Sequence, residues 1–279
     1  MNRQRLVGVG LVALGAGIAA NALLGPLALR VIRFHNSSSG ITQLTGGEAI
    51  SLVVVAPVSV VAGVLWLRGS RIAPPLALAP ALYALYTYTT EVVGAEYRRY
   101  PGNSEWFLPL HLGILALAGV IAVRAWVASS AVPPPFPTTR LRLATAAALL
   151  VPNTLFALAW LGQLAAYAGG ERSQAYRDDT ILWWLIKALD LGLVIPACAA
   201  TGIGLLRHQP FALKAAPVLT GFIACLVGAV GAMGAVQVAQ DDPTASPAVV
   251  GVGALAALAA AGVTAELLRA ASGAERVGR

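Results

Sequence analysis

Long apolar runs constrain this chain more than any other feature. A helix needs about 20 mostly apolar residues to cross the hydrocarbon core of a bilayer. Eight such runs follow one another along the 279 residues, at 6–29, 47–67, 72–93, 107–127, 141–168, 180–206, 211–239 and 247–270. Each run is continuous, whereas strands of a membrane barrel alternate in polarity over about 10 residues. The sequence therefore predicts an all-α fold, a polytopic transmembrane helical bundle of eight spans, with the lipid bilayer as its main partner.

Composition excludes the ordinary soluble classes of protein. Hydrophobic residues make up 58% of the chain and charged residues 11%, against about 25% charged residues in soluble domains. In a membrane protein, a net charge of +7 usually reflects the lysine and arginine excess that sets its orientation in the bilayer. We therefore expect no nucleic-acid partner. The two cysteines, Cys198 and Cys225, are too few for a disulfide scaffold. We expect both to be reduced and buried within their spans.

Charge distribution predicts the orientation of the bundle. With eight spans, twelve of the nineteen lysines and arginines fall at the end that holds both termini, and six fall at the opposite end. Eight of the twelve acidic residues fall at that opposite end. Because cytoplasmic loops carry the excess of lysine and arginine, we expect the plasma (inner) membrane with both termini in the cytoplasm.

A second interpretation of the first run stays open. Arg3 and Arg5 precede it, and Ala20-Asn21-Ala22 is similar to the small-residue site at which a signal peptide is cleaved. Cleavage there would leave seven spans and an external N-terminus. The apolar stretch continues to Leu29, which favours an uncleaved span.

An internal match predicts two halves. The segment from Ser51 can be laid on the segment from Asp190 at a constant offset of 139 residues, which aligns the pairs Pro57/Pro196, Gly63/Gly202 and Arg68/Arg207. We expect a first four-span half at 1–127, a proline-rich cytoplasmic linker at 128–140 and a second four-span half at 141–279. Four spans per half would make the halves parallel repeats. Chance similarity between segments with few residue types is the alternative.

Two rows of small residues predict close helix packing. They are Ala224, Gly228 and Ala232 in the seventh run, and Gly253, Ala257 and Ala261 in the eighth. Such rows let helix backbones approach closely. They indicate contacts within the chain, or a face for a homo-oligomer or another membrane protein.

Polar residues inside apolar runs are costly, so they mark candidate sites. Those of this chain predict an outward-facing polar cavity formed by Tyr83, Tyr86, Thr87, Glu91, His111, Lys187 and Asp190. Tyr83, Thr87 and Glu91 recur every four residues and share a helix face. A carboxyl group there could take up and release a proton. The alternative interpretation is an aromatic belt at the membrane interface.

Lys187 and Asp190 form a second feature, one turn apart near the middle of a span. They could pair with each other and simply hold the bundle together. They could also form part of a site for a substrate or a proton. The sequence alone leaves both interpretations open.

Catalytic signals are sparse. A metal site made of His111, His35 and Glu91 or Glu105 lacks any recognisable ligand spacing. We therefore predict no catalytic residues, no metal and no cofactor. The leading hypothesis is binding or translocation of a small molecule or a proton. The alternatives are a structural or partner-binding membrane protein and, less favoured, an intramembrane enzyme with Glu91 and His111 as acid and base.

A resemblance accompanies these patterns. Asp190-Leu191-Gly192 with Pro196, followed by Arg207-His208-Gln209-Pro210-Phe211, resembles an uncharacterised family of bacterial multi-pass integral membrane proteins. The tyrosine-rich end of the third run, with Asn103, Phe107 and His111 after it, is similar to the same family. The resemblance covers about two thirds of the chain and implies no activity, because the family has none established. The chain departs from the pattern in the charge of its loop, which carries Glu96, Arg98 and Arg99.

Overall fold

The computed structural model describes residues 3–129, 138–242 and 245–277, and within them the fold is all-α. The first part contains α1 (Arg3–Leu24), α2 (Ser38–Ile50), η1 (Ser51–Val55), α3 (Ala56–Leu67), α4 (Ala73–Val93), η2 (Ser104–Phe107) and α5 (Leu108–Ala128). The second part contains α6 (Thr139–Ala168), α7 (Gln174–Asp178), α8 (Thr180–Leu189), η3 (Asp190–Val194), α9 (Ile195–Leu206), α10 (Pro210–Ala239) and α11 (Pro247–Val277). Most of the expected linker, residues 130–137, lies outside the described residues.

Seven helices of the described chain are long and apolar enough to cross a membrane. They are α1, the continuous run of α2, η1 and α3, the run of η2 and α5, α6, the run of α8, η3 and α9, α10, and α11. The predicted count of eight is not confirmed, because α4 does not meet the same criterion. It is 21 residues long, but its tyrosines, threonines and Glu91 lower its mean hydropathy.

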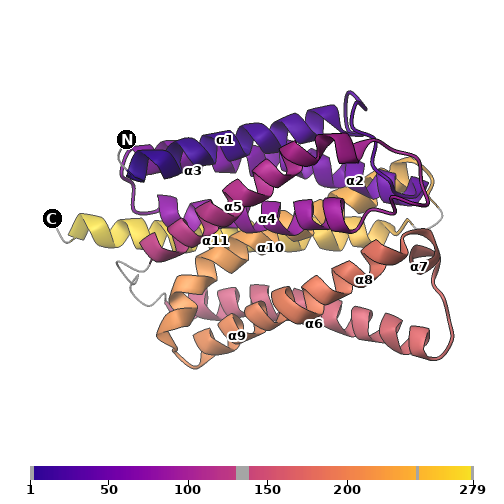
Figure 1. Cartoon of the computed structure of the whole chain (residues 1–279). Helices are drawn as coiled ribbons and strands as arrows, with labels where there is room; N and C mark the ends of the chain where they lie inside the picture. Colours follow the sequence, from indigo (N-terminus) through magenta and orange to yellow (C-terminus); the bar gives the residue numbers. More distant parts are fainter. Residues whose placement is uncertain (1–2, 130–137, 243–244, 278–279) are drawn as a thin grey trace.

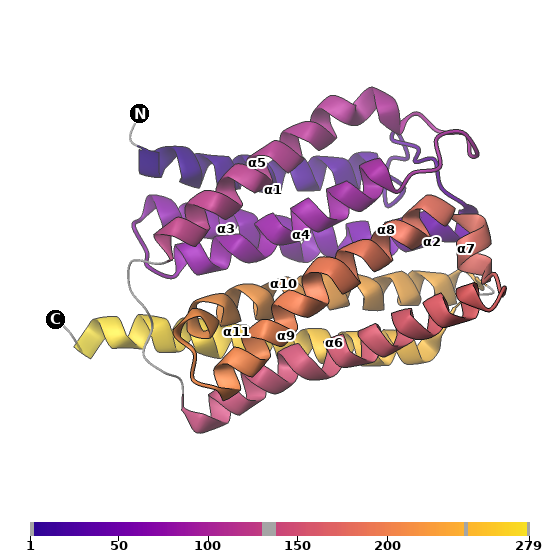
Figure 2. The ribbon, with the colours of Figure 1, turned by 60° about the horizontal axis from the view of Figure 1, so that its bottom comes forward.

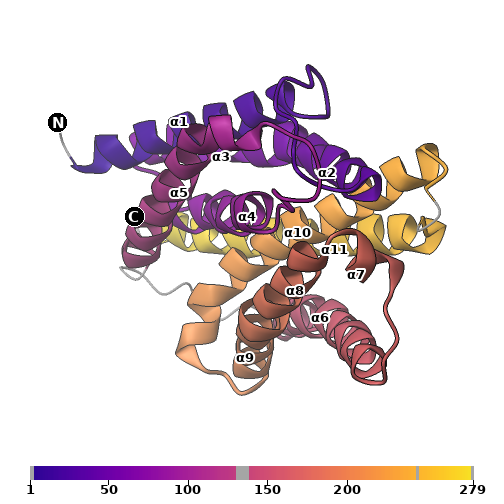
Figure 3. The same ribbon diagram turned by 45° about the vertical axis from the view of Figure 1, so that its right-hand side comes forward.

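The helices are arranged in two groups. Figures 1 and 2 show α1, α3, α4 and α5 on one side of the bundle and α6, α8 and α9 on the other. Figure 3 shows α10 and α11 between them, with α4 packed on α10 at the centre. The start of α1 and the end of α11 lie at the same end of the bundle (Figure 1).

The first helix belongs to the packed core. Leu11, Leu14, Ile18 and Ala22 are buried, and α1 packs against α3 and α5. The contact with α3 is close, because a side chain on Gly15 would overlap the carbonyl oxygen of Ala56. These buried residues form one face of α1, whereas Leu6, Val9 and Leu23 on the same helix are exposed.

Two segments share an unusual local structure. A π-helical turn precedes α3 at Ser51–Val55, and another precedes α9 at Asp190–Val194. Each following helix has proline at its second position, Pro57 and Pro196. Proline has no N–H for the carbonyl four residues earlier, and its ring crowds that carbonyl. The wider π-helical turn accommodates the ring, so the two segments differ from ideal helices in the same way.

The two small-residue rows meet inside the chain, on α10 and α11. A side chain on Gly253 would lie 2.7 Å from the Cα of Gly231, and one on Gly228 would touch the side chain of Ala257. The contact between Gly228 and Ala257 therefore agrees with the interpretation that the two rows pack against each other within the chain. Cys198 and Cys225 are free and buried, as predicted.

Candidate binding cavity

A cavity of about 460 Å³ lies between the two groups of helices. Its lining comes mainly from α2, α4, α6, α8, η3 and α10, with further residues from α7, α9 and α11. It includes the starts of α2 and α8, at the end away from the termini (Figure 1). Its walls are largely apolar, with the aromatic side chains Tyr86, Phe156, Trp160 and Trp183. The charged side chains of its lining are Glu91, Asp178, Asp179, Lys187 and Asp190.

Asp190 connects three helical segments across this cavity. It begins η3 and is 8% exposed. Its Oδ1 accepts a hydrogen bond of 2.9 Å from the hydroxyl of Tyr86 on α4, and its Oδ2 accepts one of 2.8 Å from the indole N–H of Trp160 on α6. Two neutral donors therefore stabilise one buried carboxylate.

Lys187 lies one turn earlier, enclosed by indole rings. Its Nζ is 3.6 Å from the ring centroid of Trp183 and 4.4 Å from that of Trp160. It also donates to the carbonyl of Trp183 at 3.4 Å. Desolvated cation–π contacts of this kind are worth about 2 kcal/mol. In the described chain no salt bridge joins Lys187 to Asp190, and the two side chains instead share Trp160 as a neighbour.

The polar side chains of α4 point in different directions. Tyr86, Thr90 and Glu91 line the cavity, whereas Tyr83 lies within the first group of helices. The hydroxyl of Tyr83 is 3.0 Å from that of Ser51 in η1, a hydrogen-bonding distance. A helix surrounded by others can place polar groups on more than one face, which the recurrence of Tyr83, Thr87 and Glu91 does not anticipate.

The seven residues predicted to form a cavity are thus divided. Tyr86, Glu91, Lys187 and Asp190 belong to its lining, and Tyr83, Thr87 and His111 lie outside it. His111 on α5 is buried, and its Nε2 is 2.9 Å from the amide oxygen of Asn21. The amide nitrogen of Asn21 in turn donates to Glu91 at 3.4 Å.

Two lining residues carry roles that sequence reasoning missed. Trp160 donates a hydrogen bond to Asp190. The sequence feature that could have indicated this role is the position of Trp160 deep inside an apolar run, away from the membrane interface. Asp179 binds the start of α2, which lies more than 140 residues earlier in the chain. No spacing in the sequence indicates that contact.

The start of α2 holds Asp179 at one end of the cavity. Ser37 caps this helix, accepting a bond from the N–H of Gly40. The carboxylate of Asp179 accepts bonds from the N–H and the hydroxyl of Ser37, at 3.0 and 2.5 Å, and from the Asn36 amide at 3.3 Å. Free N–H groups at a helix start favour an anion, so this contact joins the start of α2 to the segment before α8 beside the cavity.

The loop between α4 and η2 also contacts α7 and the start of α8. The guanidinium of Arg99 donates to the carbonyls of Arg177 and Asp178. The hydroxyl of Tyr100 donates to the carbonyl of Asp178 at 2.8 Å. The N–H of Ile181 donates to a Glu96 carboxylate oxygen at 2.8 Å. The first half of the chain therefore holds α7 and the start of α8 in place.

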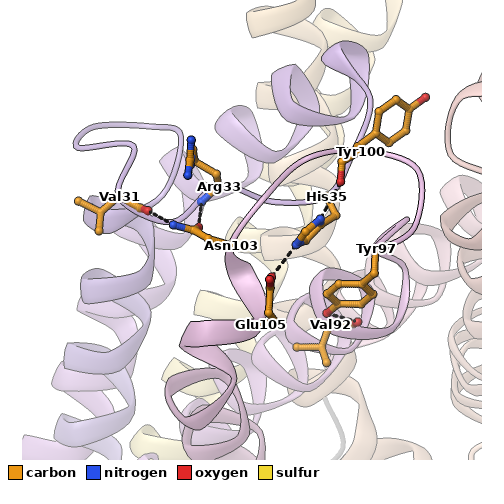
Figure 4. A network of polar contacts seen from close by, with 8 residues as sticks. All are labelled: Val31, Arg33, His35, Val92, Tyr97, Tyr100, Asn103 and Glu105. Atoms are coloured by element: carbon orange, nitrogen blue, oxygen red, sulfur yellow. Dashed lines mark hydrogen bonds and ion pairs between the residues drawn. The ribbon is translucent and has the colours of Figure 1, made fainter.

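A polar network keeps that loop folded (Figure 4). The Nδ1 of His35 is 2.7 Å from the carbonyl oxygen of Tyr100, and its Nε2 is 2.6 Å from Glu105. Asn103 accepts from the N–H of Arg33 at 2.7 Å and donates to the carbonyl of Val31 at 3.1 Å. Tyr97 donates to the carbonyl of Val92 at 2.9 Å, and its partial burial raises the pKa of its hydroxyl. These contacts join the loop after α1 to the loop after α4.

Comparison of the chain with protein-family models, curated proteins and solved structures finds no match. The resemblance to a bacterial membrane-protein family therefore stays a prediction. Among the described residues, no group of three or more histidine, cysteine, aspartate or glutamate side chains could hold a metal ion.

Proposed function

We propose that this chain is an integral membrane protein that binds a small amphipathic cation in the cavity and moves it across the membrane. The observation that carries the proposal is the lining, in which four carboxyl groups and one ammonium group face aromatic walls. The excess of acidic groups attracts a cation, and the indole and phenol rings suit its apolar body.

The size of the cavity supports a small molecule. Its volume of about 460 Å³ lies within the range of about 300–1,000 Å³ that small-molecule sites occupy. Its polar groups are few and placed on facing helices, as at sites that orient a ligand. Glu91 and Asp190 both line the cavity, from opposite groups of helices.

The proposal includes α4 as an eighth span. At 21 residues, a helix is about 32 Å long, which matches the thickness of the hydrocarbon core. It packs against α3, α5, α8 and α10, so its polar side chains face protein. We place both termini in the cytoplasm of a plasma (inner) membrane, following the charge distribution.

The proposal also includes the two halves, at 1–127 and 141–279, joined by the linker at 128–140. Its support is the pair of π-helical turns, because Ser51–Val55 and Asp190–Val194 keep the offset of 139 residues. Helices α3 and α9 keep the same offset. Parallel repeats with a site at their interface are common among transporters.

A specific observation favours a second function. Asp190 is bonded by Tyr86 and Trp160, and Asp179 by Asn36 and Ser37. Charged groups with so many internal partners could serve only to join the helices. The chain would then be a structural or partner-binding membrane protein that binds no small molecule.

Two probes of the same shape separate these functions. Tetraphenylphosphonium is a lipophilic cation, and tetraphenylborate is its anionic counterpart. We expect the cation to quench tryptophan fluorescence of the protein in nanodiscs, and Asp190→Asn to weaken its binding about tenfold, or roughly 1.4 kcal/mol. Glu171→Gln, an exposed change outside the cavity, should leave binding unchanged. Equal binding of the anion, or no binding of either probe, would contradict the proposal.

A further inference from the structure

A pair of buried acidic residues lies on α2 and α4. Glu48 on α2 is 2% exposed, and Glu91 on α4 is 5% exposed. Both carboxyl groups contact the same end of α1, Glu48 through the N–H of Leu27 just after it and Glu91 through the amide of Asn21 within it. Glu91 also belongs to the cavity lining, whereas Glu48 does not.

Glu48 has one satisfied oxygen and one unsatisfied oxygen. Its Oε2 accepts a hydrogen bond of 3.0 Å from the N–H of Leu27. Its Oε1 is buried and has no hydrogen-bond partner among the described residues. A side chain on Gly25 would lie 2.0 Å from Oε1, so the carboxyl group is pressed against the backbone just after α1. An ionised carboxylate normally accepts several hydrogen bonds, and this one has a single neutral donor.

Among the residues that the structure describes, Glu91 also has no cationic partner. Its hydrogen bond in the described chain comes from the amide nitrogen of Asn21, at 3.4 Å. Because that nitrogen donates to Glu91, the amide oxygen of Asn21 accepts from Nε2 of His111. The imidazole of His111 can satisfy this arrangement while neutral.

The other titratable groups around the pair do not compensate its charge. Tyr83 and Tyr88 lie on α4, His111 on α5, and the thiol of Cys225 on α10. On the cavity side, the other charged residues of the lining are Asp178 in α7, Asp179 between α7 and α8, Lys187 in α8 and Asp190 in η3. Lys187 is held by the rings of Trp160 and Trp183. Two buried carboxylates without a counter-ion are strongly unfavourable.

We propose that Glu48 and Glu91 form a buried proton-binding site that retains a proton at neutral pH, and that Glu91 exchanges this proton with water in the cavity. A bound proton removes one negative charge and converts one carboxyl oxygen into a donor. The proton moves between water and a carboxyl group, so no other reactant is needed. The inference does not rest on the proposed function, because it holds whether or not the cavity binds a cation.

Infrared spectroscopy of the protein in a lipid film tests the site directly. A protonated carboxylic acid has a carbonyl stretching band that shifts when water is exchanged for D₂O. We expect the wild-type protein to show this band at neutral pH, with a reduced band in Glu91→Gln and none in the double variant with Glu48→Gln. Glu266→Gln, at an exposed position, should leave the band unchanged.

Further measurements separate the alternatives. Thermal unfolding of each variant checks that it is folded, and Glu91→Gln alone is sufficient if the double variant is not. Replacing sodium chloride with choline chloride should not change the wild-type band. Absence of the band at neutral pH, or its appearance only without sodium, would overturn the proposal, because the site would then be ionised or occupied by a metal cation.

Discussion

The hydroxyl of Tyr86 donates a hydrogen bond of 2.9 Å to the carboxylate of Asp190, and this contact joins α4 in the first half of the chain to η3 in the second. Three residues earlier on α4, Tyr83 makes a similar contact with Ser51 in η1. Ser51 and Asp190 each begin a π-helical turn, 139 residues apart. One helix therefore contacts both turns through tyrosine hydroxyls.

Removing the Tyr86 hydroxyl should weaken the association of the two halves. Tyr86→Phe keeps the ring but leaves a buried carboxylate with one donor fewer, so we expect a loss of about 1–3 kcal/mol in the free energy of unfolding. The melting temperature in detergent measures this loss. Tyr97→Phe is the control, because its hydroxyl contacts a backbone carbonyl at an exposed site. Equal melting temperatures for Tyr86→Phe and wild type would refute the role given to this bond.

Lys187 should oppose the binding of a cation. Lys187→Gln removes the one ammonium group of the described cavity lining, and we expect tetraphenylphosphonium to bind several-fold more tightly, because charge repulsion is strong in a low dielectric. Equilibrium titration of tryptophan fluorescence gives the dissociation constant. Lys214→Gln, which changes a lysine outside the cavity, should have no effect. Weaker binding to Lys187→Gln would instead indicate that the ammonium group contacts the ligand.

The bond between Ser37 and Asp179 should control opening at one end of the cavity. Ser37→Ala removes a helix cap and a hydroxyl donor to Asp179, changes that typically cost about 1 kcal/mol each. We expect faster hydrogen–deuterium exchange in peptides covering the starts of α2 and α8, detected by mass spectrometry. Ser38→Ala, one position later, should exchange like wild type. Unchanged exchange in Ser37→Ala would mean that other contacts keep this end closed.

Close packing of α10 and α11 should depend on Gly253. Gly253→Leu would force a side chain into the backbone of Gly231, and overpacking of this kind typically costs about 1–3 kcal/mol. Gly262→Leu provides a matched control on the same helix, since its added side chain begins in open space. Melting temperatures of the two variants should differ clearly. A normal melting temperature for Gly253→Leu would mean that the two helices can separate without loss.

Orientation can be tested by labelling in intact cells. In a variant without Cys198 and Cys225, Arg98→Cys should react with a membrane-impermeant thiol reagent, and Ser70→Cys should react only after lysis. Ser70 lies in the loop before α4 and Arg98 in the loop after it, so the two positions lie at opposite ends of this helix. The reverse pattern would place both termini outside the cytoplasm.

Much of the secondary structure could be predicted from the sequence, because span length depends on bilayer thickness and not on tertiary contacts. The runs at 141–168 and 211–239 correspond closely to α6 and α10. Glu91, Lys187 and Asp190 stood out for a similar reason, since ionisable groups are rare in apolar spans. The sequence predicts a span at 72–93, but α4 is not among the helices of the described chain that are long and apolar enough to cross a membrane.

The sequence by itself determined most of the long helices and the ionisable groups within them, since these follow from local polarity and from the chemistry of residues such as Pro57 and Pro196. It did not determine every end, because the run predicted at 47–67 begins at Ser38 in the structure. Only the tertiary structure decided which side chains meet. The bonds of Asp190 with Trp160 and of Asp179 with Ser37 depend on how each helix is rotated about its axis and placed against its neighbours. Packing of entire helix surfaces sets that rotation, and no local spacing encodes it.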